Sequence, residues 1–365
     1  MNTWPSWLPI RDDLKSLSPY GAPQIADVIS LNTNENPYPL PVEVQKKIVE
    51  RIQEVASSLN RYPDRDAVRL RAKLAEYVNQ RSALSISVEN IWAANGSNEI
   101  LQTLFLACGG ENRRALGFTP SYSVHPLISK ITGTEWIAGT RREDFSIDVE
   151  SAVQQILKEA PSIVFVTTPN NPSGTATSIE DIEKFAVAAG KVGALLVVDE
   201  AYAEFSSEKS AAVLMGEYPH VVSSRTMSKA FAFAGVRLGY LVGHPSVIDA
   251  SLVTRLPYHL SALTQAAAEV AIDNCDLMQS GIDDLLSERE MLSRGLATLG
   301  WRALESSANF LLFTGFDKPS KDVWNEFLKK GILIRDVGLD GYLRVTVGTQ
   351  AENQRFLTVA SEIAQ

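Results

Sequence analysis

The middle of the 365-residue chain alternates between short apolar runs and longer stretches whose apolar residues recur at helical spacing. The runs that we expect to be buried strands are RRALGF (113–118), SIVFVTT (162–168), VGALLVVDEAY (192–202) and HVVSSRT (220–226). The expected helices between them are NEILQTLFLACG (98–109), SVHPLISKITG (123–133) and IEDIEKFAVAAGK (179–191). This alternation predicts an α/β fold, with a mainly parallel sheet that is covered on both faces and binds ligands at the C-terminal ends of its strands.

The pattern changes near residue 260, where two long helical stretches precede short strands. The helical stretches are LSALTQAAAEVAIDNCDLMQ and GIDDLLSEREMLSRGLATLG, and the strands are NFLLF, ILIRDV and YLRVTVG. They predict a smaller α+β domain. Four prolines in the first 23 residues indicate an extended arm. We therefore predict an arm at residues 1–32 that packs on the small domain or on a partner subunit, a large domain at 33–260 and a small domain at 261–365.

Composition argues against several classes of protein. The formal net charge of −9 argues against a nucleic-acid partner, because proteins that bind nucleic acids carry a basic face. Cys108 and Cys275 form no Cys-x-x-Cys pair, and the four histidines never stand at metal-ligand spacing, so we expect no metal. No apolar run is long enough to cross a membrane, and the first residues lack the apolar core of a signal peptide. We expect a soluble, cytoplasmic protein.

One lysine stands in a run of small and apolar residues, SRTMSKAFAFAGVRLGY (224–240). Lys229 follows Thr226 and Ser228 and precedes Arg237. Burial among apolar neighbours lowers the pKa of an amine and makes it nucleophilic. The alternative is a lysine that extends from a half-buried helix into water. Other motifs have to decide between these interpretations.

Two loops present polar side chains after expected strands. TTPNNPSG (167–174) is a rigid loop that exposes Asn171, although such a motif alone is often only a turn. LLVVDEAYAEF (195–205) places Asp199 at the end of a strand and Tyr202 three residues later. A buried carboxylate at that point needs a cation or a protonated nitrogen, unless it caps a helix.

A third stretch, AANGSNEIL (93–101), places glycine, serine and asparagine at the start of a helix, where free N–H groups suit a phosphate or an ordinary cap. Together the motifs provide what pyridoxal phosphate requires: an amine for its aldehyde, an anion for its ring nitrogen, partners for its ring oxygen and a phosphate site. The residues are, in that order, Lys229; Asp199; Asn171 and Tyr202; and Thr226, Ser228 and Arg237 with Gly96, Ser97 and Asn98.

The chain resembles the fold-type I pyridoxal-phosphate aminotransferases of class II. The resemblance extends from Leu31 to Thr349. Its motifs are LNTNENPYPLP, RYPD, GSNEIL, PSYSVHP, TTPNNPSG, VVDEAYAEF, RTMSKAFAFAGVRLGY, LPYHLSALTQ, ILIRDVG and YLRVTVGT. It implies a large domain with a mainly parallel seven-stranded sheet, a small C-terminal α+β domain, and a homodimer with active sites at the subunit interface.

The resemblance also implies roles for individual residues. Lys229 would bind the cofactor's aldehyde and move a proton, with Asp199 and Tyr202 completing the catalytic set. Tyr122 would stack on the ring, and Tyr62 would reach the phosphate from the partner subunit. The implied substrate-binding residues are Tyr20, Asn32, Tyr122, Asn171, Arg335 and Arg344. Two alternatives stay open: Tyr20 only anchors the arm, and Arg335 only forms a surface ion pair.

The activity implied is reversible amino transfer between L-histidinol phosphate and 2-oxoglutarate, a step of histidine biosynthesis, in a ping-pong cycle. An aminotransferase for aromatic amino acids is the main alternative, because the two differ only in pocket side chains. A decarboxylase on the same scaffold would release carbon dioxide without consuming a keto acid. A non-catalytic regulator would need an added DNA-binding domain, for which the chain leaves no room.

Overall fold

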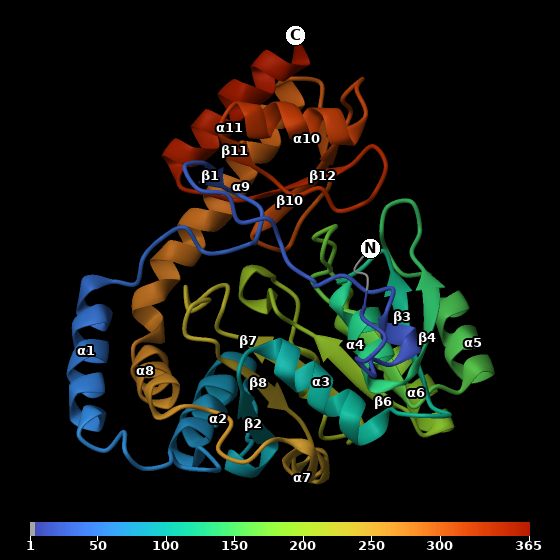
Figure 1. The fold of residues 1–365 in the computed structure, drawn as a ribbon, viewed down its shortest axis with the longest axis vertical. Helices are drawn as coiled ribbons and strands as arrows, with labels where there is room; N and C mark the ends of the chain where they lie inside the picture. The colour runs from blue at the N-terminus through green and yellow to red at the C-terminus, as the bar shows by residue number, and fades with distance from the viewer. Residues whose placement is uncertain (1–3) are drawn as a thin grey trace.

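The computed structural model describes residues 4–365, and its centre is a seven-stranded sheet (Figure 1). The strand order is β2-β8-β7-β6-β5-β3-β4, and β8 alone runs in the direction opposite to the other six strands. The strands are β2 (Ile91–Ala94), β3 (Arg114–Thr119), β4 (Glu135–Thr140), β5 (Ile163–Thr167), β6 (Leu195–Asp199), β7 (Val221–Thr226) and β8 (Gly239–Val242). The predicted α/β fold and its mainly parallel sheet are confirmed; β2, β4 and β8 were missed as strands.

Helices cover both faces of this sheet because successive strand side chains point to opposite sides. In β5, Val164 and Val166 pack with the α5 and α6 side, while Phe165 packs with the α3 and α4 side. The helices of this part are α1 (Val42–Ala56), α2 (Val68–Ser82), α3 (Ser97–Cys108), α4 (Val124–Thr132), α5 (Val149–Glu159), α6 (Ile179–Val192), α7 (Pro245–Thr254) and α8 (Ala262–Asp273). The expected helices at 98–109, 123–133 and 179–191 are α3, α4 and α6.

The C-terminal part forms a second layer, seen at the top of Figure 1. A three-stranded antiparallel sheet in the order β12-β10-β9 packs with α9, α10 and α11. The bounds are α9 (Gln279–Thr298), β9 (Arg302–Ala303), β10 (Phe310–Thr314), α10 (Ser320–Lys329), β12 (Leu343–Thr346) and α11 (Gln350–Ala364). The expected strand ILIRDV is shorter: β11 (Ile332–Leu333) pairs instead with β1 (Ile29–Ser30), because the N-terminal segment supplies its partner.

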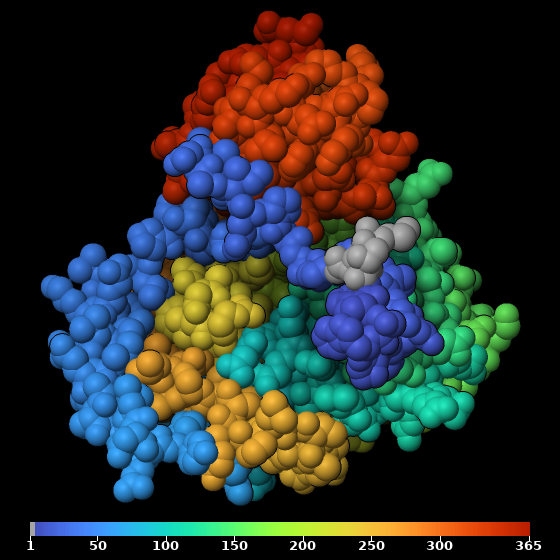
Figure 2. Space-filling view, viewed as in Figure 1, coloured from blue at the N-terminus to red at the C-terminus, as the bar shows by residue number. Residues whose placement is uncertain are grey.

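The N-terminal segment crosses between the two parts (Figure 2). Its short helix η1 (Asp12–Leu14) packs on α4, and Arg11 donates hydrogen bonds to the carbonyl oxygens of Lys130 and Ile131. Residues 1–3 of the expected arm lie outside the described residues. The helix α8 packs on α1 and α2. The division into parts at residues 32 and 260 remains a proposal.

Across residues 4–365, no helix combines the length and apolar composition that a membrane crossing requires. Within the same range, no three His, Cys, Asp or Glu side chains gather closely enough to hold a metal ion.

Candidate active site

A cavity of about 500 Å³ lies at the C-terminal ends of β5, β6 and β7, where a parallel sheet places its ligands. Segments far apart in the chain line it, from the N-terminal segment to the C-terminal sheet. The predicted site residues in its lining are Tyr20, Asn32, Ser97, Asn98, Tyr122, Asn171, Asp199, Tyr202, Thr226, Ser228, Lys229, Arg237, Arg335 and Arg344. Only Gly96 and Tyr62, of the residues predicted, lie outside that lining.

Lys229 follows β7, and its side chain lines the cavity. Nζ donates a hydrogen bond to the carbonyl oxygen of Thr33, 2.9 Å away. Burial and, after it, the positive charge of Arg344 together lower the pKa of Lys229 from 10.5 to about 8. An amine with this pKa has about one-tenth of its molecules uncharged at pH 7, far more than an ordinary lysine, and so is a better nucleophile. The interpretation of Lys229 as a residue extending into water does not fit this geometry.

Asp199 ends β6 with one of its two oxygens unpaired. Oδ2 lies 3.0 Å from His125 Nε2, and both side chains are almost fully buried. Oδ1 is buried and has no hydrogen-bond partner among the described residues. Burying a carboxylate oxygen without a hydrogen-bond donor costs free energy, so this atom is suited to accept a hydrogen bond from a protonated group in the cavity. It caps no helix, which removes the alternative raised by the sequence.

His125 was missed by the sequence reasoning, although it stands in the motif PSYSVHP. Its ring stacks on Phe165, with centroids 5.0 Å apart, and Tyr122 contacts it edge to face. His125 Nε2, which donates to Oδ2 of the carboxylate, leaves Oδ1 of Asp199 free to face the cavity. Only the folded sheet brings α4 beside the end of β6, so the signal in the sequence was the motif alone.

The start of α3 forms one wall of the cavity. Gly96 caps the helix with φ +83°, and no side chain caps the N–H groups that follow it. A Cβ at Gly96 would lie 2.6 Å from Arg237 Nη2, so only glycine lets this guanidinium lie against the loop. Gly96 thus shapes the site without lining it.

Arg237 completes this wall from an unusual backbone conformation. Its φ of +62° lies in the left-handed region, which costs a non-glycine residue about 1 kcal/mol or more. Nη1 donates to Ala234 O at 3.0 Å and to Ser228 Oγ at 3.4 Å, while Thr226 Oγ1 and Ser228 Oγ are 3.0 Å apart. A guanidinium, two hydroxyls and the N-terminus of a helix together suit a phosphate.

The groups expected around a ring oxygen already have protein partners. Tyr202 Oη accepts a hydrogen bond from Asn34 Nδ2 at 2.9 Å, and Asn171 Oδ1 accepts one from Arg344 Nη1. Asn34 was not predicted, although it lies in the motif LNTNENPYPLP. Burial raises the pKa of Tyr202, so its hydroxyl stays protonated and able to donate.

Two arginines from the C-terminal part face the same cavity. Residues Arg335 and Arg344 pair through their backbones, at 2.9 Å in both directions. Arg344 donates to two neutral oxygens, on Asn171 and Asn32, and its Nε is buried with no partner among the described residues. Burial lowers the pKa of Arg344 to about 10. A guanidinium without an anionic partner is a ready site for a substrate anion.

The structure bears on the two alternatives left open by the sequence, an anchoring role for Tyr20 and a surface ion pair for Arg335. Tyr20 lines the cavity and is 49% exposed, a position compatible with substrate binding. The neighbouring Asp336 pairs with Lys321, and within residues 4–365 Arg335 itself forms no ion pair. Tyr62, by contrast, is 78% exposed, stacks on Tyr258 and does not line this cavity.

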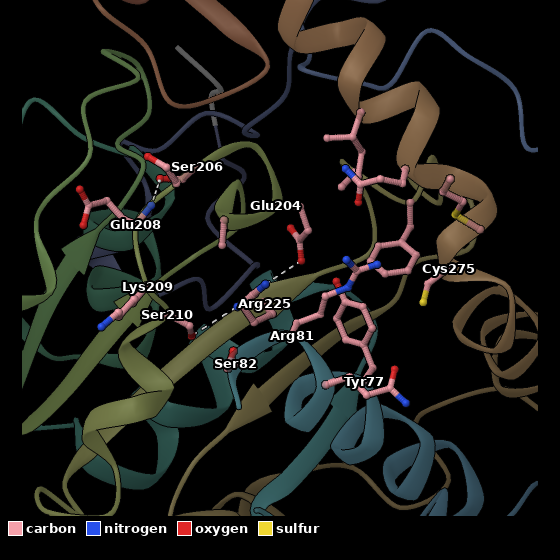
Figure 3. A pocket seen from close by; sticks show the side chains of 18 of the residues that line it. Tyr77, Arg81, Ser82, Glu204, Ser206, Glu208, Lys209, Ser210, Arg225 and Cys275 are labelled. Atoms are coloured by element: carbon pink, nitrogen blue, oxygen red, sulfur yellow. Dashed lines mark hydrogen bonds and ion pairs between the residues drawn. The ribbon is translucent and has the colours of Figure 1, made fainter. Parts of the chain in front are cut away.

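A second cavity, of about 520 Å³, is lined by the end of α2, by the segment that follows β6 and by Arg225 of β7, and we call it the rear cavity (Figure 3). Arg225, the neighbour of Thr226 on β7, donates to Glu200 at 3.2 Å and to Glu204 at 2.7 Å. Burial opposes the charge of Arg225, but Glu204, Tyr240 and Glu200 outweigh it and raise the pKa of the guanidinium. This paired network holds the strands whose other sides carry Asp199 and Thr226.

The family model for aminotransferases of class I and II matches residues 26–359. The chain belongs to this family. It is 51% identical over 360 residues to a histidinol-phosphate aminotransferase of Mycobacterium sp. strain KMS, covering 98% of this chain and 94% of that one. A relative with the same name from Mycolicibacterium smegmatis is 51% identical over 359 residues, with the same coverage. The resemblance stated from the sequence is confirmed.

Among solved structures, the histidinol-phosphate aminotransferase of Sinorhizobium meliloti in complex with pyridoxal-5'-phosphate matches with a TM-score of 0.85. It is 21% identical and covers 98% of this chain and 97% of its own, so it bears on the aminotransferase fold alone. The cavity itself supplies the test for that cofactor. The unpaired Asp199 oxygen, the cradle at Gly96 and the low-pKa amine of Lys229 all fit pyridoxal phosphate.

Proposed function

We propose that this aminotransferase transfers an amino group between L-histidinol phosphate and 2-oxoglutarate in histidine biosynthesis. Its cofactor is pyridoxal 5'-phosphate, which supplies an aldehyde and an electron-accepting ring when it is bound. The observation that carries the choice of substrate is the 51% identity, over 98% of this chain, to relatives named histidinol-phosphate aminotransferase. The buried guanidinium of Arg344, which has no anionic partner among the described residues and faces the same cavity as Lys229, supplies a site for the substrate's anion.

Both substrates carry an anion far from the reacting nitrogen. Histidinol phosphate has a phosphate and no carboxylate, whereas glutamate has two carboxylates. A planar guanidinium forms two parallel hydrogen bonds with either anion. Arg344 and Arg335 together therefore bind the anion of whichever substrate is present, while Tyr20 and Tyr122 provide aromatic surface for the imidazole.

The chain's own groups divide the remaining work. Lys229, with its lowered pKa, would accept a proton from the substrate carbon and donate it to the cofactor's aldehyde carbon. Asp199, held by His125, keeps a ring nitrogen protonated. Arg237, Ser228 and the start of α3 hold a phosphate, and the buried hydroxyl of Tyr202 donates to a ring oxygen.

Steady-state kinetics test this function. With 2-oxoglutarate as acceptor, kcat/KM for histidinol phosphate should exceed that for phenylalanine by orders of magnitude. Replacing Arg344 by methionine should lower kcat/KM for histidinol phosphate about 10²-fold or more, because the anion loses a buried charged partner. A preference for phenylalanine would make the protein an aromatic aminotransferase. Carbon dioxide release without glutamate formation would make it a decarboxylase.

The assembly and location belong to the same proposal. The enzyme works as a homodimer in the cytoplasm, and each subunit completes the other's site with Tyr62. The exposed ring of Tyr62, which does not line the cavity of its own chain, supports this arrangement. Sedimentation velocity of the purified protein and fractionation of cells test the two statements separately.

A further inference from the structure

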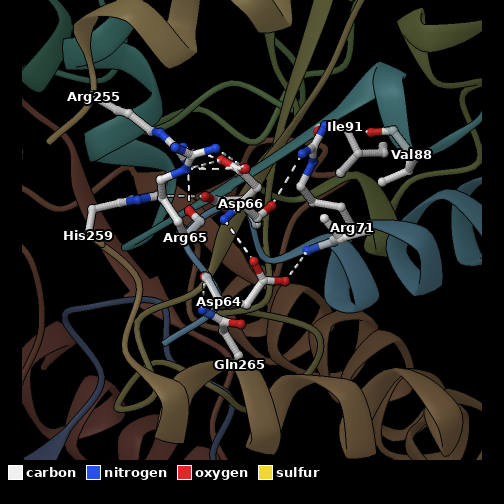
Figure 4. Close-up of polar contacts among 11 residues, drawn as sticks. Asp64, Arg65, Asp66, Arg71, Val88, Ile91, Arg255, His259 and Gln265 are labelled. Atoms are coloured by element: carbon white, nitrogen blue, oxygen red, sulfur yellow. Dashed lines mark hydrogen bonds and ion pairs between the residues drawn. The ribbon is translucent and has the colours of Figure 1, made fainter. Parts of the chain in front are cut away.

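The motif LPYHLSALTQ plays no part in the function described so far, yet it contacts both the loop before α3 and the loop that carries Tyr62. Figure 4 shows the contacts of this part of the chain with Asp64, Arg65 and Asp66. The motif lies within residues 255–265, which link the end of α7 to the first turn of α8, and we call this stretch the linking segment. The structure gives it two separate sets of contacts.

The first set holds the loop before α3. His259 Nε2 contacts Ala93 O at 2.8 Å, so this nitrogen carries the proton and donates. The carbonyl oxygen of His259 accepts a hydrogen bond from Asn95 Nδ2 at 2.9 Å. Its ring also packs against Trp92, with centroids 5.7 Å apart. His259 therefore fixes the two residues on either side of Ala94, directly before the Gly96 turn.

The second set holds the loop that carries Tyr62. Arg255 donates to Arg65 O at 2.8 Å and pairs with the carboxylate of Asp66. The side chain of Arg255 is only 7% exposed, so this contact is shielded from water. Arg65 also pairs with Asp66, but its side chain is 61% exposed and belongs to the same loop.

Further contacts hold the rings of Tyr62 and Tyr258 against each other. Gln265 Nε2 donates to Asp64 O and to Leu260 O, both at 3.0 Å, and so joins the two loops at their bases. Tyr62 stacks on Tyr258 with ring centroids 4.3 Å apart. Tyr258 has φ +55°, a strained conformation that turns its ring toward Tyr62. Two loops without shared secondary structure are thereby held as one rigid unit.

We propose that the linking segment positions both halves of the cofactor-phosphate site: His259 fixes the α3 loop of its own subunit's pocket, and Arg255 fixes the Tyr62 loop for the partner's pocket. Arg255 and His259 are positioning residues, since neither lines the cavity. This inference rests on the proposed function in two respects, the homodimer and the phosphate of its cofactor. It is independent of which amino acid is the substrate.

Cofactor affinity tests the role of Arg255. Titration of cofactor-free protein with pyridoxal phosphate, followed by absorbance, should show that Arg255→Met raises the dissociation constant about tenfold, the loss of roughly one charge-assisted hydrogen bond. Pyridoxal, which lacks the phosphate, should bind the variant and the parent equally. Arg65→Met is the matched control, because it removes the exposed guanidinium from the same carboxylate, and it should leave both constants unchanged.

A double-mutant cycle with Tyr62→Phe separates positioning from general damage. If Arg255 acts through Tyr62, the double variant binds pyridoxal phosphate no more weakly than Tyr62→Phe alone. Additive losses, equal losses for pyridoxal, or an unchanged constant in Arg255→Met would each overturn the proposal. Should Arg255→Met fail to fold, Asp66→Asn keeps the shape of the contact and carries the same expectations.

Hybrid dimers decide which pocket each residue serves. A subunit with Lys229→Met cannot be tagged, so borohydride reduction reports only the other subunit's Lys229. In a hybrid with the Lys229→Met subunit, the Arg255→Met pocket should regain the parental affinity, because the partner's Tyr62 loop is intact. A His259→Leu pocket should stay weak in the same hybrid, whereas His259→Gln, which keeps a donor, should bind normally. The opposite pattern would refute the assignment. A parent protein that takes up no pyridoxal phosphate would instead refute the proposed function.

Discussion

The active-site cavity and the rear cavity meet at the end of β7 but differ in how their charged groups are paired. On the active-site side, Asp199 keeps one buried oxygen unpaired and burial lowers the pKa of Lys229 to about 8. On the rear side, Arg225 bonds both Glu200 and Glu204 and its pKa is raised, so each charge has an opposite charge beside it, although Arg225 Nε and Glu204 Oε2 form no hydrogen bond within residues 4–365. Neighbouring residues on one strand, Arg225 and Thr226, thus belong to different environments.

The difference shows how this chain separates stability from chemistry. Partly unpaired charges are costly in a protein interior, and they persist where a ligand completes them. Behind them, Glu200 accepts hydrogen bonds from Ser210, Ser223 and Arg225 and from the backbone of Ala211. The paired side holds the strand ends in place, so that the unpaired side can keep its geometry before the cofactor arrives.

The largest effect should come from the active-site side. Lys229→Met should lower kcat by about 10⁴-fold, the upper range for a positioned general base, because no other amine lines the cavity within residues 4–365. Pyridoxal phosphate should still bind, without a borohydride tag at this position. Single-turnover measurements with histidinol phosphate check the rate. Turnover close to that of the parent would show that another group moves the proton.

The next largest effect should come from the rear side, and in stability. Arg225→Met leaves two buried carboxylates without their cation and should lower the free energy of unfolding by about 3–5 kcal/mol. Turnover per folded, cofactor-loaded subunit should change little. Arg114→Met, which removes a partly exposed pair with Glu159, is the control and should cost about 1 kcal/mol or less. Urea unfolding measures both. Equal losses in the two variants would contradict the comparison.

Asp199→Asn should reverse the balance on the active-site side. The amide cannot hold a protonated ring nitrogen, so kcat should fall by about 10²–10³-fold. Folding should not suffer, since an unpaired buried charge is removed. Thermal unfolding of the cofactor-free variant should therefore occur at or above the parental temperature. A clear drop in that temperature would mean that the bond from His125 matters more for stability than the charge costs.

The smallest effect concerns the pH dependence of the cofactor-free protein. The folded pKa of Lys229, about 8, lies below its unfolded value of 10.5, so the unfolded chain binds more protons between these values and stability rises with pH there. At pH 7 the full penalty is present. Lys229→Met should then be more stable than the parent by about 2 kcal/mol, after allowing for the lost bond to Thr33. The gap should close by pH 10.5 in urea titrations.

Strands and motifs were predictable where they depend on local pattern. Residues 163–167 and 195–199 are mainly apolar runs, and a buried parallel strand needs little else. The strand β8 was missed because GYLV continues the lysine motif and pairs antiparallel with segments far away. The pairing of β1 with β11 was also missed, since two residues carry no periodicity.

The sequence alone determined the identities of the groups in the site, because the lysine, the aspartate and the glycine before α3 each stand in a recognisable local motif. Only the tertiary structure decided their states. It placed His125 against Asp199 and left one Asp199 oxygen without a hydrogen-bond partner. It also buried Arg344 with no anionic side chain of residues 4–365 bonded to it. The physical reason is that a motif specifies which atoms are available, whereas pKa values and unpaired bonds depend on what distant segments bring beside them.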